Sequence, residues 1–585
     1  MSFNNVTPFQ IPVPASLRWM ASAGERLLGL NTLDDYYHRR QPGMSSKAFL
    51  SFILESLDIS YHVTTGNLSS MPEHGPVVVV ANHPFGAIEG VVIAQLLLNI
   101  RSDVKILANQ YLHRIQELSD LFIGVDVFDN EYANKSNFSG VRKSIGHLKQ
   151  GGVLLVFPAG EVSSLRLGQK GITDREWNRI IGMMIRKTQA KTLPVYIDGS
   201  NSKIFHMAGM IHPRFRTMLL AREVLNKRNK KLSLHVGEII NSSELKKLGS
   251  DEAITQYMRL NTYLLASRAC NNNVVNKFRG KYTRPIIPDI DKELLQKNIN
   301  ELSADRLMVV NDDYEVYCAP ANELEYVLPE IGRLREITFR QVGEGTGLDC
   351  DLDNYDENYL HLFMWHKENQ QLIGAYRLGL VDKLLAKGGI KGLYSRSLFN
   401  YNQDFINSLG QSIEMGRSFV RQEYQRSISA LLLMWKGIAT YVARQPQYTT
   451  LFGPVSISSD YSELSRSLIT SFLQAHHYDD WRARKLKPTN PQKKNPKQFW
   501  TRKMLAELGD NKLISKLIYR MEGDKGLPVL IRQYLSLKGS LVSFNVDRDF
   551  NDALDGMIII NLMDVPEKVL SKYMGKEEAH RFLNR

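Results

Sequence analysis

Cysteine is scarce in this chain: 585 residues contain only three, Cys270, Cys318 and Cys350, and none belongs to a C-x-x-C pair. Such spacing builds neither a disulfide framework nor a zinc site, so we expect free thiols in a reducing compartment and no bound metal. Long apolar runs are also missing, because no segment reaches the roughly 18–20 residues of a membrane-spanning helix. The polar start MSFNNVTPF lacks the regions of a signal peptide. We therefore expect a protein of the cytoplasmic side.

Negative charge is the third shortage. Asp and Glu total 61 against 74 Lys and Arg, which gives a formal net charge of +13. This balance favours an anionic partner: nucleic acid, an acidic membrane face or an acidic carrier protein. No basic motif interleaved with aromatic residues is present, which argues against nucleic acid. Segment 16–29 (SLRWMASAGERLLG) predicts a helix that either packs on its own domain or lies at a membrane interface.

The length fits two or three domains, and 43% apolar residues are enough for packed cores. In the first half, short apolar strands alternate with helices: 77–80, 89–100, 103–108, 138–150, 153–157, 177–190 and 193–197. This alternation predicts an α/β domain with a largely parallel sheet. The polar, proline-bearing segment 271–310 predicts a linker between domains at 1–270 and 311–585.

The second half predicts another α/β domain. Apolar strands at 360–367 and 371–380 flank the dipeptide Asn369-Gln370, which suits a hairpin turn. Further expected elements are a strand at YEVYCA (314–319) and helices at 322–339 and 427–444.

The most informative stretch is VVVVANHPFGAIEG (77–90), in which His83 follows a buried strand and Glu89 stands six positions later. A histidine in this place can take a proton from a hydroxyl if a carboxylate fixes its tautomer. The loop between them, with Gly86 allowing a tight path, returns Glu89 towards His83. We therefore expect a base and its orienting acid; a purely structural hydrogen bond is the alternative.

This stretch resembles the first motif of the lysophospholipid and glycerolipid acyltransferases, a histidine, four residues, then aspartate. Here the acid is glutamate and comes one residue later, the spacing of the hemolysin-like, ornithine-lipid branch. FPAGE (157–161) resembles the family's third motif, which binds the acceptor head group, although Ala159 replaces the family's glutamate; a plain turn is the alternative. Leu193-Pro194 resembles the fourth motif. The resemblance implies catalysis by His83 and Glu89 and substrate binding by Asn82, Phe157, Pro158, Gly160 and Glu161.

The reaction that this resemblance implies is acyl transfer. His83 would take the proton of an acceptor hydroxyl as its oxygen attacks an acyl thioester, and Glu89 would hold the histidine. Helix N-termini and backbone amides would stabilise the oxyanion.

The C-terminal half lacks the GxSxG, P-loop, HExxH and Rossmann fingerprints. From about 314 to 565, its motifs resemble in order the acyl-homoserine-lactone-synthase and hemolysin-like branch of the GNAT-type N-acyltransferases. The resemblance implies a GNAT-like α/β fold and assigns catalysis to Glu414 and substrate binding to six residues: Arg335 and Phe339 (R-x-x-x-F), Asp353 and Asp356 (D-x-x-D), Arg377, and Arg417 (E-x-x-R with Glu414).

An amine must be neutral to attack, so Glu414 is expected to receive its proton. The arginines suit the acceptor's carboxylate or a carrier's phosphopantetheine; a salt-bridge network that braces the domain is the alternative. The residues after Val420 lack the pyrophosphate loop of CoA-dependent GNATs. This departure favours acyl carrier protein as the donor, with acyl-CoA as the alternative, and no bound cofactor is expected.

Together the two halves resemble the bifunctional ornithine lipid synthases of bacteria. The resemblance implies N-acylation of ornithine with a 3-hydroxyacyl chain by the C-terminal domain, then O-acylation of this lyso-lipid by the N-terminal domain, at the cytoplasmic surface of the inner membrane. Glycine, lysine and glutamine stay open as acceptors. Three alternatives remain: a lysophospholipid acyltransferase, a C-terminal half that only binds the carrier, and a basic nucleic-acid-binding protein.

Overall fold

The computed structural model describes residues 7–10, 18–125, 131–166, 171–271, 283–425 and 428–585. The chain forms two compact units. The N-terminal unit comprises residues 1–273 and 499–513, and the C-terminal unit comprises 274–498 and 514–585. Segment 499–513, which contains α20 (Arg502–Ala506), thus joins the N-terminal unit, whereas the sequence analysis placed it within 311–585.

A seven-stranded sheet forms the centre of the N-terminal unit, in the order β1-β7-β6-β2-β5-β3-β4. Neighbouring strands run parallel except for β6 and β7, which confirms the predicted largely parallel sheet. The central strand β2 is buried along its whole length, as its run of valines predicts. The strands are β1 (Ser60–Thr65), β2 (Val77–Ala81), β3 (Val104–Asn109), β4 (Phe122–Val125), β5 (Val153–Val156), β6 (Lys191–Ile197) and β7 (Lys231–Val236).

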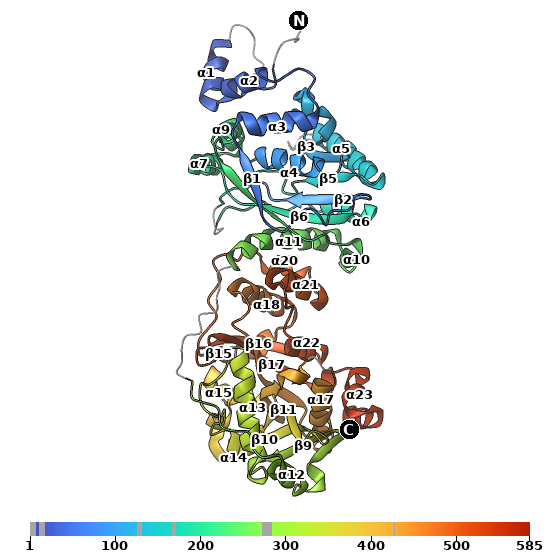
Figure 1. Ribbon diagram of the computed structural model, residues 1–585, viewed down its shortest axis with the longest axis vertical. Coiled ribbons are helices and arrows are strands. Elements are labelled where there is room, and N and C mark those ends of the chain that lie inside the picture. Colours follow the sequence, from blue (N-terminus) through green and yellow to red (C-terminus); the bar gives the residue numbers. More distant parts are fainter. Residues whose placement is uncertain (1–6, 11–17, 126–130, 167–170, 272–282, 426–427) are drawn as a thin grey trace. The chain divides into compact units, whose positions relative to one another are not determined.

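Helices cover both faces of this sheet (Figure 1). α3 (Ser46–Ser56) and α4 (Ile88–Leu98) lie on one face, and the long α11 (Asp251–Asn271) lies on the other. The core therefore fills two layers around the sheet. The remaining helices of this unit are α1 (Arg18–Leu28), α2 (Leu30–His38), α5 (Glu131–Lys149), α6 (Ile180–Thr188), α7 (Lys203–Ile211), α8 (Pro213–Met218), α9 (Leu220–Leu225) and α10 (Ser242–Leu245).

The C-terminal unit contains an eight-stranded sheet in the order β16-β17-β14-β13-β11-β10-β9-β8. β10 and β11 form the predicted antiparallel hairpin, and Gln370 in its turn has a φ of 49°. β13 and β14 run parallel and pair only over residues 412–414 of β13, so the two strands are not bonded beyond Glu414. The strands are β8 (Leu307–Asn311), β9 (Tyr314–Pro320), β10 (Leu360–His366), β11 (Gln371–Leu380), β13 (Ser412–Val420), β14 (Thr450–Ile457), β16 (Ser540–Asp547) and β17 (Ala553–Asn561).

Two helices cover opposite faces of this sheet. α13 (Val327–Gln341) shares a core with Tyr317 and Phe363. A side chain at Gly437 of α17 (Ile428–Arg444) would instead meet Val316 and Leu362, which point to the other face because neighbouring strand residues alternate.

The remaining elements of this unit include a small sheet of β12 (Phe399–Tyr401) and β15 (Leu486–Pro488). The helices are α12 (Lys292–Asn300), α14 (Val381–Gly388), α15 (Ser395–Leu398), α16 (Gln403–Asn407), α18 (Glu463–His476), α19 (Asp480–Ala483), α21 (Asn511–Glu522), α22 (Val529–Ser536), α23 (Glu567–Met574) and α24 (Lys576–Leu583).

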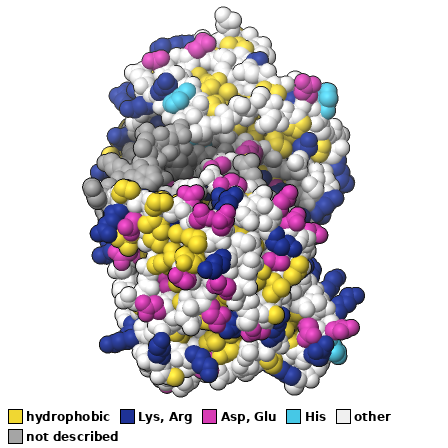
Figure 2. All heavy atoms as spheres, turned by 60° about the horizontal axis from the view of Figure 1, so that its bottom comes forward, with side chains coloured by type: hydrophobic (Ala, Val, Ile, Leu, Met, Phe, Trp, Pro, Cys, Tyr) yellow, Lys and Arg dark blue, Asp and Glu magenta, His cyan; other side chains and the backbone are white. Residues whose placement is uncertain are grey.

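The segment predicted as a linker, 271–310, is only partly described, because residues 272–282 lie outside the described ranges. Residues 283–310 of this segment belong to the C-terminal unit and form α12 and the start of β8. Among the described residues, no helix combines the length and apolarity needed to cross a membrane. On the face drawn in Figure 2, Lys and Arg side chains are interspersed with Asp and Glu.

The packing of α6 against α11 gives a stability test. A Cβ at Gly182 of α6 would lie 2.0 Å from the backbone oxygen of Asp251, so Gly182→Ala must push the helices apart. Overpacking of this kind costs about 1–3 kcal/mol, more than the roughly 1 kcal/mol that alanine gains over glycine in a helix. We expect a lower midpoint of thermal unfolding.

The matched control is Gly146→Ala in α5, where a Cβ meets nothing within 4 Å. This exchange should leave the midpoint unchanged or raise it. Equal midpoints for the two variants would contradict the helix packing.

Candidate active sites

The carboxyl ends of β2 and β5 carry the first site. His83 follows β2 by two residues, and Glu89 lies in the first turn of α4, with His83 Nδ1 2.9 Å from Glu89 Oε1. The structure thus brings together the two residues that the sequence pattern paired. Nε2 of His83 has no hydrogen-bond partner in the described part of the chain, and the ring reaches the cavity described below.

Glu89 is completely buried and is held by the loop that connects it to His83. Its Oε1 accepts hydrogen bonds from the backbone N–H groups of Phe85 and Gly86, both at 2.8 Å, and Oε2 accepts one from Ala87 at 3.1 Å. These amides at the start of α4 are therefore occupied by Glu89. They cannot also be the oxyanion donors that the sequence analysis sought at helix N-termini.

The charges of this pair stabilise each other. Burial lowers the pKa of His83, but the neighbouring Glu89 carboxylate, with a contribution from Asp174, outweighs it and raises the pKa above its ordinary value. Burial raises the pKa of Glu89, and the His83 contact together with the loop amides outweighs it, so Glu89 stays ionised. An ionised Glu89 fixes the proton of His83 on Nδ1 and leaves Nε2 as the base.

Two further buried residues place the backbone around His83. The Asp174 carboxylate accepts hydrogen bonds from the His83 backbone N–H at 3.2 Å and from the Trp177 indole at 3.0 Å. The Asn82 side chain exchanges two hydrogen bonds with the backbone of Ile197 in β6. The amide nitrogen and the amide oxygen of Asn82, which was predicted to bind substrate, are thus both hydrogen-bonded inside the protein. Nothing in the sequence pattern indicated Asp174.

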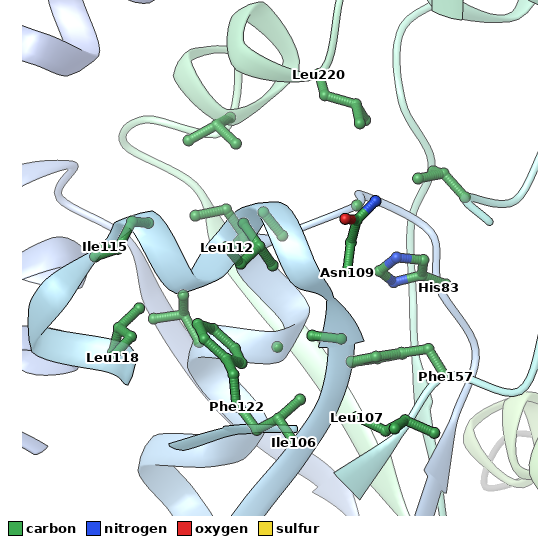
Figure 3. A pocket seen from close by; sticks show the side chains of 18 of the residues that line it. His83, Ile106, Leu107, Asn109, Leu112, Ile115, Leu118, Phe122, Phe157 and Leu220 are labelled. Atoms are coloured by element: carbon green, nitrogen blue, oxygen red, sulfur yellow. The ribbon is translucent and has the colours of Figure 1, made fainter. Parts of the chain in front are cut away.

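An apolar cavity of about 800 Å³ opens at His83. Figure 3 shows the imidazole beside Asn109 and Phe157, with a run of apolar side chains leading away from it. The His83 ring stacks on Phe157 with 4.4 Å between ring centroids. The apolar run comprises Ile106, Leu107, Leu112, Ile115, Leu118 and Phe122. This cavity suits an acyl chain whose reactive end lies at His83.

Polar residues line another part of the cavity. Pro158, Gly160 and Glu161, all predicted to bind substrate, are among its lining residues. The Glu161 carboxylate lies 2.8 Å from Arg216 and 3.1 Å from Arg166, and a third arginine, Arg175, lies at 4.0 Å. The excess of positive charge around Glu161 suits an anionic head group. No motif contains these arginines: Arg175 and Arg216 come from other segments, and Arg166 follows FPAGE by five residues.

In the C-terminal unit, Arg335 is almost completely buried in α13. Its guanidinium lies 2.9 Å from Asp356 and 3.1 Å from Asp351. Burial raises the pKa of the Asp356 carboxyl, but the charges of Arg335 and Arg377 hold it well below its ordinary value. Phe339, four residues further along α13, packs against the core. These contacts favour the alternative of a bracing network for Arg335, Phe339 and Asp356.

Arg377 and Arg417 converge on Asp353. Arg377 lies 2.6 Å from the Asp353 carboxylate, and Arg417 lies 3.7 Å from it and 3.5 Å from Asp351. The Arg417 guanidinium also lies over the ring of Tyr394, 5.3 Å from its centroid. Arg417 adopts a left-handed backbone conformation with a φ of 48°, which is uncommon for a side chain of this size.

Glu414 is buried and satisfied by protein donors. Its carboxylate accepts hydrogen bonds from the Tyr359 hydroxyl and from the backbone N–H groups of Tyr394, at 3.0 Å, and Ser395, at 2.7 Å. Glu414 therefore holds the loop that presents Tyr394 to Arg417. For Glu414 to accept a proton as predicted, one of these three donors must first break its hydrogen bond to the carboxylate.

Three acidic side chains that sequence reasoning did not single out lie near Arg417: Glu344, Asp547 and Asp555. Burial, then repulsion from Asp555 and other carboxylates, raises the pKa of Glu344 to about 8. Burial raises the pKa of Asp555 to about 7, assisted by Asp547, although the Ser456 hydroxyl and Arg417 oppose the shift. Carboxylates of this kind can accept a proton near neutral pH. They come from the loop after α13, from β16 and from β17, so no local motif contains them.

Comparison with known proteins places both parts of the chain among acyltransferases. Residues 17–271 match the family described as acyltransferase, and residues 334–436 match the acetyltransferase (GNAT) domain. The glycine N(alpha)-acyltransferase of Bacteroides thetaiotaomicron is 30% identical over 299 residues, which cover 48% of this chain and 87% of that protein. Its namesake from Phocaeicola vulgatus is 32% identical over 304 residues, covering 48% and 90%. The lyso-glycine lipid O-acyltransferase of P. vulgatus is 27% identical over 199 residues, covering 33% and 68%.

The raised pKa of His83 gives a direct test of the pair. Glu89→Gln removes the adjacent negative charge, so the pKa of His83 should fall. The measurement is a pH titration of histidine ring signals by NMR, with the His83 signal identified from its absence in His83→Gln. Because only neutral His83 can act as a base, any reaction that uses it should slow as the pH falls below this raised pKa.

The control is Glu161→Gln, which removes a carboxylate of the same cavity that does not contact His83. It should leave the His83 titration unchanged. A His83 signal that titrates identically in wild type and Glu89→Gln would show that the pair is not formed.

Proposed function

The chain belongs to the acyltransferase family that includes the glycine N(alpha)-acyltransferases, and we propose that it is a bifunctional enzyme that builds a doubly acylated amino acid. The C-terminal unit would attach a 3-hydroxyacyl chain to the α-amine of an amino acid. The N-terminal unit would then acylate the new 3-hydroxyl. The observation that carries the proposal is the His83–Glu89 pair at one end of an apolar cavity of about 800 Å³.

In the N-terminal unit, His83 Nε2 would remove the proton of the lyso-lipid hydroxyl while that oxygen forms a bond to the carbonyl carbon of the acyl thioester. The carbon–sulfur bond then breaks, and the proton passes from His83 to the leaving thiolate. Glu89 stabilises the imidazolium formed in between. The apolar cavity would hold an acyl chain, and the arginines around Glu161 would attract the carboxylate of the lyso-lipid.

In the C-terminal unit, the acceptor's ammonium group would first lose a proton to a carboxylate of the Glu344, Asp547 and Asp555 group, whose raised pKa values suit this transfer better than the fully bonded Glu414. The neutral amine would then form a bond to the carbonyl carbon of the thioester of the first acyl chain. The carbon–sulfur bond would break, and the second amine proton would pass to the leaving thiolate. Arg417 would bind the carboxylate of the acceptor. Glu414 would act as a positioning residue by holding the loop of Tyr394.

We take glycine as the acceptor, because the names of the two relatives at 30% and 32% identity support it. Ornithine, which the motif resemblance implied, is the second candidate. One observation favours it: three carboxylates lie near Arg417, more than the single ammonium group of glycine needs, and they would also pair with the second amine of ornithine.

Acyl carrier protein is our proposed donor, and the cytoplasmic surface of the inner membrane is the proposed location. The net charge of +13 would attract an acidic carrier, and the product would partition into a bilayer.

The function is tested by lipid mass spectrometry of a bacterial host that lacks aminolipids. The wild-type chain should yield a phosphorus-free, doubly acylated amino acid. His83→Ala should accumulate the singly acylated lyso form, since loss of a general base costs about 10²- to 10⁴-fold in rate. Glu414→Ala should yield neither lipid.

The matched control is His74→Ala, which removes an exposed histidine of the same unit. It should leave both lipids unchanged. A phospholipid acyl composition that changes with His83→Ala, without any aminolipid, would instead identify a lysophospholipid acyltransferase.

The acceptor is tested with purified enzyme, acyl carrier protein loaded with a 3-hydroxyacyl chain, and glycine or ornithine. We expect a higher kcat/KM for glycine, and a loss of at least about tenfold in Asp555→Asn because its proton acceptor is removed. Glu357→Gln, at an exposed carboxylate, is the control. Preference for ornithine, lost selectively in Asp555→Asn, would show that the carboxylates bind the second amine instead.

A further inference from the structure

One short stretch of the N-terminal unit is unusually rich in exposed apolar side chains. In the helix pair α7 and α8, six large hydrophobic side chains are between 49% and 78% exposed: Ile204, Met207, Met210, Ile211, Phe215 and Met218. We call these six residues the α7–α8 surface. Scattered single exposed hydrophobic residues are ordinary, but a group of this size on two adjoining helices marks an interaction site.

The helix pair has a well-defined inner face, so the outer face is not a sign of loose packing. Phe205 and His206 of α7 are buried, and the Ser202 hydroxyl caps the first turn of the helix. The spacing of Ile204, Met207 and Ile211 places these three on one side of α7. Gly209 of α7 lies against Arg216 of α8, which joins the two helices closely.

The chain segment that carries this surface is basic. From residue 199 to residue 222 the sequence contains no Asp or Glu. Lys203, Arg214 and Arg222 are exposed there. Two acidic residues bound this segment: Glu223 is buried and accepts hydrogen bonds from Ser202, and Asp198 pairs with His235 at 2.8 Å. Exposed apolar side chains flanked mainly by basic ones are the pattern of a helix that lies at an anionic membrane surface.

The helix pair is also a wall of the acyl cavity. Arg216 and Thr217 of α8 and Leu220 of α9 line the cavity at His83. A Cβ at Gly86, in the loop between His83 and Glu89, would meet Leu220, so the start of α9, which directly follows the helix pair, packs on that loop. The segment from α7 to the start of α9 thus lines the cavity with some of its side chains and exposes others.

We propose that the α7–α8 surface docks on a lipid bilayer with anionic head groups and places the rim of the acyl cavity at the membrane. This inference rests on the proposed function, because a lipid acceptor gives the bilayer its role. Exposing the CH₂ groups of an acyl chain to water is unfavourable. A cavity wall that is itself in the membrane interface lets the chain enter without that exposure.

Other occupants fit the surface less well. A second copy of the chain would bring Lys203, Arg214 and Arg222 of both copies together, which is unfavourable.

The test is co-sedimentation of the full chain with vesicles of phosphatidylethanolamine and phosphatidylglycerol. Ile211→Asp should weaken binding at least tenfold, and the charge variant Lys203→Gln/Arg222→Gln should weaken it and reduce its salt dependence. The matched control is Phe138→Asp, which changes a comparably exposed apolar residue on α5 of the same unit and should bind like the wild type. Circular dichroism confirms that each variant is folded.

Several results would overturn the proposed membrane docking. Wild-type protein that ignores the vesicles, or Ile211→Asp that binds like wild type, overturns the proposal. A dimer in sedimentation velocity that Ile211→Asp dissolves, or a carrier-protein complex that it breaks with vesicle binding intact, overturns it in favour of that partner.

The vesicle measurement needs no acyl transfer, so it stands apart from the proposed function. A chain that binds vesicles through Ile211 but makes no aminolipid would retain the membrane surface and refute the acceptor. Conversely, acylation of a short-chain, water-soluble acceptor should be unchanged in Ile211→Asp.

Discussion

The N-terminal site depends on one buried carboxylate. Glu89 has no exposure to water, and removing an ionised group from water is costly unless it is fully hydrogen-bonded. Three loop amides supply hydrogen bonds and the His83 imidazole supplies a charge contact at 2.9 Å, so the loop conformation, the start of α4 and the orientation of His83 are interdependent. Gly86 is required in this loop for two reasons: its φ is 101°, and any Cβ would meet Leu220 and Val162.

The C-terminal unit uses buried charge in a different way. Arg335 and Asp356 pair inside the protein, where loss of one partner would leave an uncompensated charge. Arg377 bridges from this pair to Asp353, and Arg417 reaches Asp353 and Asp351. The bracing network and the proposed binding site are therefore one chain of contacts. Its inner end is satisfied by protein groups, and its outer end at Arg417 lies over Tyr394 and near the carboxylates of raised pKa, Glu344, Asp547 and Asp555.

The features that the sequence predicted correctly depend on residues that lie close together along the chain. The buried valine strand, the β10–β11 hairpin and the approach of Glu89 to His83 each depend on residues close in sequence, and the structure has all three. Asp174 contacts the His83 backbone across 91 residues, and Arg216 reaches Glu161 across 55, so neither leaves a spacing pattern. The role of Glu414 was unpredictable for another reason: a motif shows that a carboxylate is present, but not that Tyr359, Tyr394 and Ser395 already occupy it.

Under the proposed function, the two sites would match their bases to two different nucleophiles. A hydroxyl loses its proton only as it attacks, so it needs a base that can carry positive charge in the transition state, and His83 beside ionised Glu89 would provide this. An amine arrives as an ammonium group and must lose a proton beforehand, which calls for an acceptor whose pKa is raised towards neutrality. Burial gives Glu344 and Asp555 that property, at about 8 and about 7. An incoming ammonium would stabilise their ionised forms, so the carboxylates would first bind the cation and then take its proton.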